Sequence, residues 1–229
     1  MRTIDRPDTQ GASGPRPARH SASSAGRVLA RLASWRVVVV ATTAWVVFAV
    51  VLFASSAPFS IPHVEAACGQ APPDVRAYTG PTEVHDFLEA CGPIGREAYR
   101  NLQLADLVYP LVVGLALASA LALALRHLFP RRPAIVVWSA LPLLASGFDY
   151  LENLGAWSAL AAYPSTSPID ALLGLASAAK TATSWLAGLT LVLALVALGV
   201  RAVRRRSSGA GVELRPTSAG AGTTAGMVR

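Results

Sequence analysis

Charged residues are scarce in this sequence, and lysine is almost missing. Of 229 residues only 14% are charged, and the 20 basic residues are 19 arginines and one lysine, Lys180. The hydrophobic fraction is 53% and the mean hydropathy is +0.45. This composition is typical of a membrane protein.

Several motifs that carry chemistry are also absent. The sequence has neither a Gly-rich phosphate loop nor the His/Glu spacing of a metal site, so we expect no cofactor and no bound metal. No base-stacking platform or reading motif accompanies the arginines, which argues against nucleic-acid binding despite a formal charge of +7. No internal repeat is evident, so an inverted-repeat transporter gains no support.

Four long apolar runs dominate the rest of the chain, at about residues 37–55, 104–125, 134–162 and 169–200. A helix needs roughly 20 apolar residues to cross a hydrocarbon core of about 30 Å. Segments such as 111–125 are apolar on all sides, unlike the one-sided helices of a soluble core. The sequence therefore predicts an all-α, four-helix transmembrane bundle with crossings at 35–56, 104–125, 134–162 and 169–200.

Arginines predict the orientation, because basic residues near membrane ends stay on the cytoplasmic side. Residues 1–36 carry seven arginines, the link 126–132 carries three and the tail from 201 carries six, whereas 56–103 carries three beside six acidic residues. We expect a multi-pass cell-membrane protein with cytoplasmic termini, and disordered basic tails at 1–34 and 201–229 that attract anionic lipids. A signal peptide with residues 37–53 as its apolar part is the competing interpretation, but the preceding 36 residues are long for that role.

The segment 57–103 is predicted to lie outside the membrane and contains both cysteines, Cys68 and Cys91. Because an external location is oxidising, a disulfide is the leading interpretation. It would stabilise the folded state by roughly 3 kcal/mol. A metal site with His63 or His85 is the alternative, although the spacing fits no zinc pattern. The same segment predicts one short helix ending at Gly92 and a second that continues without a break into the next crossing.

Polar residues inside the apolar runs mark the candidate site. Asp149, Glu152 and Asn153 share one side of the third crossing, because they are spaced i, i+3 and i+4. A carboxylate near the bilayer centre costs roughly 2.5 to 3.5 kcal/mol on insertion scales, so such groups usually face a protein interior. At a rise of about 1.5 Å per residue, the charges on three helices reach one level near the outer leaflet. The expected cluster consists of Tyr99, Gln103, Asp106, Asp149, Glu152, Asn153 and Lys180.

Three interpretations of this cluster remain open. The first is a hydrogen-bonded network that fixes the register of the helices, and the second is a ligand site. The third is a set of charged side chains that reach water or lipid headgroups. Paired carboxylates beside Lys180 also suit acid-base work, but no nucleophile accompanies them. The spacing Ser177-x-x-Lys180 occurs in some acyl-transfer enzymes, but the accompanying motifs are missing. We assign no catalytic residue.

The chain resembles a group of uncharacterised bacterial four-pass membrane proteins over about residues 77–190. The likeness rests on Gly92-Pro93-Ile94-Gly95-Arg96-Glu97-Ala98-Tyr99, on Gln103, Asp106 and Tyr109-Pro110, and on Asp149-x-x-Glu152-Asn153 followed by a Tyr-Pro turn and Lys180. The resemblance implies the topology and a recurring polar constellation, and it brings no activity.

From these observations we expect a non-enzymatic integral membrane protein whose polar site at the outer leaflet binds a lipid headgroup or a small amphiphile. The alternatives are an intramembrane enzyme or proton-coupled transporter using Asp149, Glu152 and Lys180, and a structural or assembly subunit. Expected partners are membrane lipids, with a second copy or another membrane protein left open.

Overall fold

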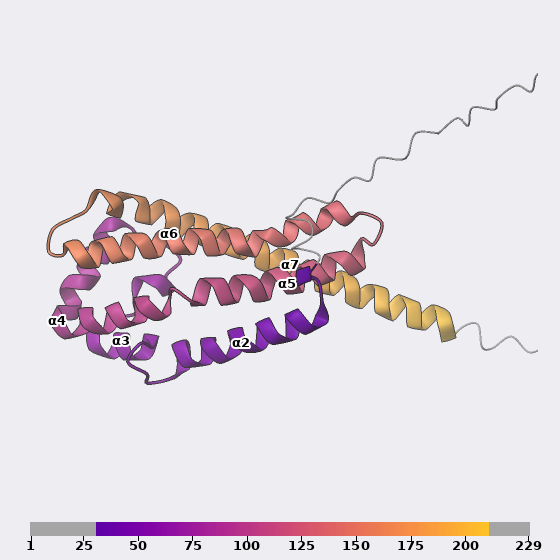
Figure 1. Ribbon diagram of the computed structural model, residues 1–229, viewed down its shortest axis with the longest axis horizontal. Coiled ribbons are helices and arrows are strands. Elements are labelled where there is room, and N and C mark those ends of the chain that lie inside the picture. Colours follow the sequence, from indigo (N-terminus) through magenta and orange to yellow (C-terminus); the bar gives the residue numbers. More distant parts are fainter. Residues whose placement is uncertain (1–30, 211–229) are drawn as a thin grey trace, which may run out of the picture.

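The computed structural model describes residues 31–210, and every regular element in that range is helical. The elements, in chain order, are α2 (Trp35–Ala54), α3 (Ile61–Cys68), η1 (Pro73–Val75), α4 (Pro81–Ala105), α5 (Tyr109–Leu128), η2 (Pro133–Ala140), α6 (Leu141–Ala162), η3 (Pro168–Leu172) and α7 (Leu173–Ala210). Here η denotes a short 3₁₀ helix. The long elements form the predicted four-helix bundle (Figure 1).

Four helical stretches in the described range are long and apolar enough to cross a membrane, at Trp35–Ala54, Pro81–Leu128, Pro133–Ala162 and Pro168–Ser207. They contain the four apolar runs of the sequence. Few residues of the first and last stretches are buried inside the protein. Their apolar side chains therefore face outward, where a soluble protein would carry polar ones.

The helices pack in a simple order. Helix α6 lies against α7, α2 lies against α5, and α5 contacts both α6 and α7. Figure 1 shows α6 and α7 along one flank, α2 along the other, and α4 followed by α5 between them. Small residues bring the helices close. A Cβ atom added at Gly155 of α6 would lie 2.8 Å from Leu173 Cδ1 and 3.1 Å from Leu173 Cβ.

One end of the bundle is closed by a compact cap, residues 55–105, which comprises α3, η1 and α4. Cys68 and Cys91 form the predicted disulfide there, with an S–S distance of 2.08 Å. The predicted helix end at Gly92 is also confirmed, because this residue has φ 60° inside α4, a left-handed conformation that glycine adopts without a Cβ clash. Val64, Phe87 and Tyr99 of the cap are fully buried in its core.

The expectation of an unbroken helix through the second crossing was wrong. Helix α4 ends at Ala105 and α5 begins at Tyr109, so three residues interrupt the path. Pro110 explains the break, because it has no N–H to donate to the carbonyl of Asp106 four residues earlier.

The tail prediction also requires correction, because α7 continues through residues 201–210. Arginine has a high helix propensity, and the Arg201 guanidinium donates to the Leu128 carbonyl at 2.6 Å. Figure 1 shows this part of α7 extending past the other helices at the end opposite the cap. Of the predicted tails at 1–34 and 201–229, residues 1–30 and 211–229 lie outside the described part of the chain.

Candidate functional site

Lys180 is the centre of a buried polar cluster beneath the cap. Its ammonium group donates to Asp149 Oδ1 at 3.1 Å and to the Asp74 carbonyl at 3.2 Å, and it pairs with Glu152 Oε2. The Lys180 and Asp149 side chains are 15% and 14% exposed, and that of Glu152 is 3% exposed. All three ammonium protons therefore have protein acceptors.

Two helices and a loop bring these groups together. Asp149 and Glu152 are one turn apart on α6 and point to the same side, and Lys180 reaches them from α7. Their predicted proximity is confirmed. Asp74 comes from η1, far away in sequence, and sequence reasoning missed it. Its only signal was an acidic residue directly after Pro72-Pro73, which favours a short turn.

Gln103 and Tyr99 hold the η1 segment in place from α4. The Gln103 amide donates to Asp74 Oδ1 at 2.6 Å and to the Tyr99 hydroxyl at 2.9 Å. Tyr99 is fully buried, with its ring edge against Phe87 at a centroid distance of 4.9 Å. These two predicted residues therefore position Asp74 and do not touch Lys180 themselves.

The next loop segment is fixed to α7 by two hydroxyl groups. The Thr79 N–H donates to Ser177 Oγ at 3.0 Å, and the Thr181 hydroxyl donates to the Ala77 carbonyl at 2.7 Å. Ser177 is fully buried. Its place in the Ser-x-x-Lys spacing thus has a packing explanation, because its oxygen accepts a backbone N–H of the loop.

Asn153 and Tyr150 of α6 form hydrogen bonds to the backbone between α4 and α5. The Asn153 amide donates to the Asp106 carbonyl at 3.3 Å, and the Tyr150 hydroxyl donates to the Leu107 carbonyl at 2.9 Å. Backbone carbonyls that leave a helix inside a membrane need such partners, because lipid supplies no donors. This contact also brings the carboxylate of Asp106 to the edge of the cluster.

The cluster contains more acidic groups than basic ones. Asp106 lies within electrostatic range of Asp74, Asp149 and Lys180. Asp149 and Glu152 both pair with Lys180, so this ion-pair group has one more negative than positive formal charge when both carboxylates are ionised. Acceptors are also in excess. Within residues 31–210, no donor reaches one oxygen on each of the following side chains: Asp74, Gln103 and Asn153.

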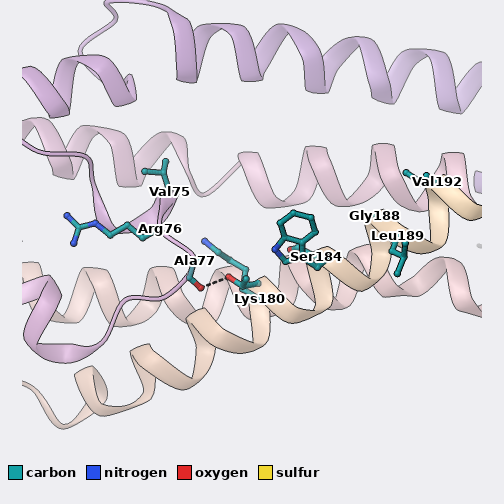
Figure 2. A pocket seen from close by; sticks show the side chains of 10 residues that line it. Val75, Arg76, Ala77, Lys180, Ser184, Gly188, Leu189 and Val192 are labelled. Carbon is teal, nitrogen blue, oxygen red and sulfur yellow. Dashed lines mark hydrogen bonds between the residues drawn. The ribbon is translucent and has the colours of Figure 1, made fainter.

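A groove on the outer face of α7 begins beside the cluster. It has a volume of about 690 Å³ and lies between α7 and residues 75–77 of the cap (Figure 2). Lys180, Thr181 and Ser184 line it near the loop, and Gly188, Leu189 and Val192 line it farther along α7. Figure 2 shows the Arg76 side chain directed away from α7, and its guanidinium donates to the Ala71 carbonyl at 2.9 Å.

A smaller cavity lies inside the bundle, between α5, α6 and α7. Its volume is about 250 Å³, and its polar lining includes Tyr109, Ser146 and Asp149. Lys180 and Ser184 line both this cavity and the groove. The two hollows therefore share a wall on α7, and the Asp149 carboxylate is accessible from the inner one.

The other candidates of the sequence do not join this cluster. His85 Nε2 lies 3.0 Å from Asp170 Oδ2, which ties α4 to η3 within the cap end. Asp170 also accepts the Ser167 N–H at 2.7 Å, as in a capping box. His63 lines a separate surface hollow beside Pro93 and Ile94. The two cysteine sulfurs are bonded to each other, so neither is a free thiolate that could bind a metal together with His63 or His85.

Comparisons with protein-family models, with curated proteins and with solved structures return no match for this chain.

Proposed function

We propose that the protein binds a single-chain amphiphile taken from the outer leaflet of the cell membrane, and that it does so without catalysing a reaction. The observation that carries the proposal is the groove on α7. Its polar wall adjoins the buried cluster, and its apolar wall runs along the membrane-facing surface of the helix. A molecule with a polar head and an apolar chain matches that order of surfaces.

The proposed orientation places the cap outside and both termini in the cytoplasm. Arg36, Arg126 and Arg201 lie at the end of the bundle opposite the cap, which we call the arginine end. The Arg126 guanidinium of α5 donates to the Ala33 carbonyl, just before α2, at 3.2 Å. Arginines that remain cytoplasmic put the cluster and the head of the groove at the outer leaflet.

The size and position of the groove support an amphiphile. Sites for small molecules usually have volumes of about 300 to 1,000 Å³, and the groove falls in that range. It opens sideways, where Leu189, Val192 and Trp185 are more than half exposed on α7. A ligand that diffuses in the membrane reaches it without crossing the cap.

A matched pair of glycine substitutions tests the proposal. Gly188 lines the groove and Gly199 does not, yet both lie on α7 and have open space around the position of an added Cβ. They are eleven residues apart, which is about three helical turns, so both face nearly the same side. Gly188→Leu fills the groove, whereas Gly199→Leu makes the same chemical change beyond it.

The readout is native mass spectrometry of the full chain extracted in a neutral detergent. We expect the wild type and Gly199→Leu to retain the same amphiphile, and Gly188→Leu to lose about nine-tenths of it, a tenfold weaker binding. Equal retention by all three proteins would refute the groove as the binding site. Two other roles for the cluster, an intramembrane enzyme or proton-coupled transporter and an assembly subunit, predict that equal result.

A further inference from the structure

The excess of acceptors beside Lys180 points to the chemistry of the head group. We infer that the amphiphile carries a protonated primary amine, which enters the inner cavity and binds the Asp149 carboxylate. This inference rests on the proposed amphiphile-binding function and adds the class of ligand to it.

Charge is the first argument. Lys180 pairs with two carboxylates, Asp149 and Glu152, and neutralises one of them, so one formal negative charge remains when both are ionised. In a low-dielectric site an unbalanced charge attracts a counter-ion far more strongly than it does in water. An anionic head group would add to the excess, whereas a cationic one reduces it.

Hydrogen bonding is the second argument, and it separates one kind of cation from another. The ammonium protons of Lys180 and the amide protons of Gln103 already have acceptors. The unpaired oxygens of Gln103 and Asn153 belong to side chains that are 0% and 1% exposed and do not line the cavity, so the acceptor that a head group meets there is the Asp149 carboxylate. A primary ammonium brings three N–H donors, whereas a quaternary ammonium brings charge without donors.

The shape of the cavity is the third argument. Its volume of about 250 Å³ equals the share of about eight water molecules in the liquid, which suits a small head group and not a sugar chain. One oxygen of the Asp149 carboxylate accepts a hydrogen bond from Lys180, and the carboxylate can accept further hydrogen bonds. Tyr109 and Ser146 supply further oxygens on the same lining.

The route into the cavity follows from the shared wall. Ser184 lines both hollows and is exposed, and Lys180 stands one turn from it on α7. A head group at the polar end of the groove therefore passes Ser184 to reach Asp149, while its chain remains against Gly188 and Leu189. An organic amine is favoured over a metal ion, because no three His, Cys, Asp or Glu side chains within residues 31–210 are grouped to hold one.

The test compares three probes with the same twelve-carbon chain: dodecylammonium, dodecyltrimethylammonium and dodecyl sulfate. Binding to the full-length protein in nanodiscs of zwitterionic lipid is measured by isothermal titration calorimetry, with empty nanodiscs subtracted for partitioning. We expect dodecylammonium to bind about tenfold more tightly than either other probe. Asp149→Asn should reduce this preference to about twofold or less, whereas Asp86→Asn, the same change at an exposed cap residue, should preserve it.

The outcomes distinguish failure of the amine inference from failure of the proposed function. If the quaternary or the anionic probe binds as tightly as the primary amine, and Gly188→Leu abolishes that binding, the amine is refuted and the groove remains. If no probe binds above the empty discs, both proposals are refuted.

A second variant keeps the test decisive if Asp149→Asn fails to fold. Ser184→Leu alters an exposed residue on the route to Asp149, so the fold should tolerate it. We expect Ser184→Leu to abolish the preference for dodecylammonium, while all three probes still bind weakly through their alkyl chains. An unchanged preference in a folded Ser184→Leu protein would contradict the route through the shared wall.

Discussion

The amide of Asn153 on α6 donates a hydrogen bond to the carbonyl of Asp106, the residue that directly follows α4, at 3.3 Å. This carbonyl lacks its usual helical donor because Pro110 stands four residues later. The contact makes α6 part of the turn between α4 and α5, although the two segments are distant in sequence.

Replacing Asn153 should therefore destabilise the bundle. Asn153→Leu keeps the volume but leaves the Asp106 carbonyl buried without a donor, and we expect the free energy of unfolding to fall by about 1 to 2 kcal/mol. Thermal unfolding in detergent measures it. Tyr150→Phe removes the neighbouring bond to Leu107 at a side chain that is 36% exposed, so its loss should be smaller. A larger loss for Tyr150→Phe would contradict this account.

The ion pairs of Lys180 should be strongly coupled. Lys180→Met leaves two carboxylates without their cation, and we expect the free energy of unfolding to fall by about 3 to 5 kcal/mol. Adding Glu152→Gln to that variant should restore part of it, because one uncompensated charge disappears. A double-mutant cycle should give a coupling of about 1 to 3 kcal/mol between the two residues. Additive effects in denaturant unfolding would show that the pair does not interact energetically.

Two glycines of α6 should respond oppositely to the same substitution. Gly155→Ala places a methyl group 2.8 Å from Leu173 Cδ1, so α6 and α7 must separate. We expect the free energy of unfolding to fall by about 1 to 3 kcal/mol. A Cβ atom added at Gly147 has nothing within 4 Å. Gly147→Ala should therefore raise the free energy of unfolding by up to about 1 kcal/mol, because alanine has the higher helix propensity. Melting temperatures of the two variants, measured side by side, decide this.

Breaking the disulfide should loosen the cap and leave the bundle in place. Cys68 and Cys91 are separated by 23 residues, and a closure of that length contributes about 3 kcal/mol in the chain-entropy account. We expect a double Cys68→Ser, Cys91→Ser variant to show faster amide exchange in α3 and the first half of α4. Reductant should do the same to the wild type and should leave the double variant unchanged.

The orientation is open to direct labelling. Glu89 in the cap and Ser207 near the end of α7 are both exposed. A membrane-impermeant maleimide added to intact cells should label Glu89→Cys and spare Ser207→Cys until the cells are opened. Labelling in the reverse order would invert the proposed topology and would move the groove to the inner leaflet.

Local patterns predicted much of this structure from sequence. The four apolar runs, the cysteine pair and the helix end at Gly92 each depend on a few neighbouring residues or on composition. The meeting of Asp149, Glu152 and Lys180 was also predictable, because helices of known rise in a membrane of known thickness leave little freedom in depth. Their role in binding stays a prediction.

What sequence reasoning missed depends on contacts between distant segments. Asp74 enters the cluster only because Gln103 and Lys180 bind its side chain and its carbonyl. The break at Asp106 is stable because α6 supplies the missing donor. A proline inside an apolar run is by itself compatible with either a continuous or an interrupted helix. The extension of α7 depends in part on a contact from Arg201 to the end of α5.

Helix α7 has a mechanical consequence for the whole molecule. Its 38 residues form one continuous rod about 57 Å long, with Lys180 near one end and Arg204–Arg206 near the other. A rod without a hinge transmits rotation. A tilt of α7 beside Lys180 would therefore also displace Arg204–Arg206 at the far end of the helix.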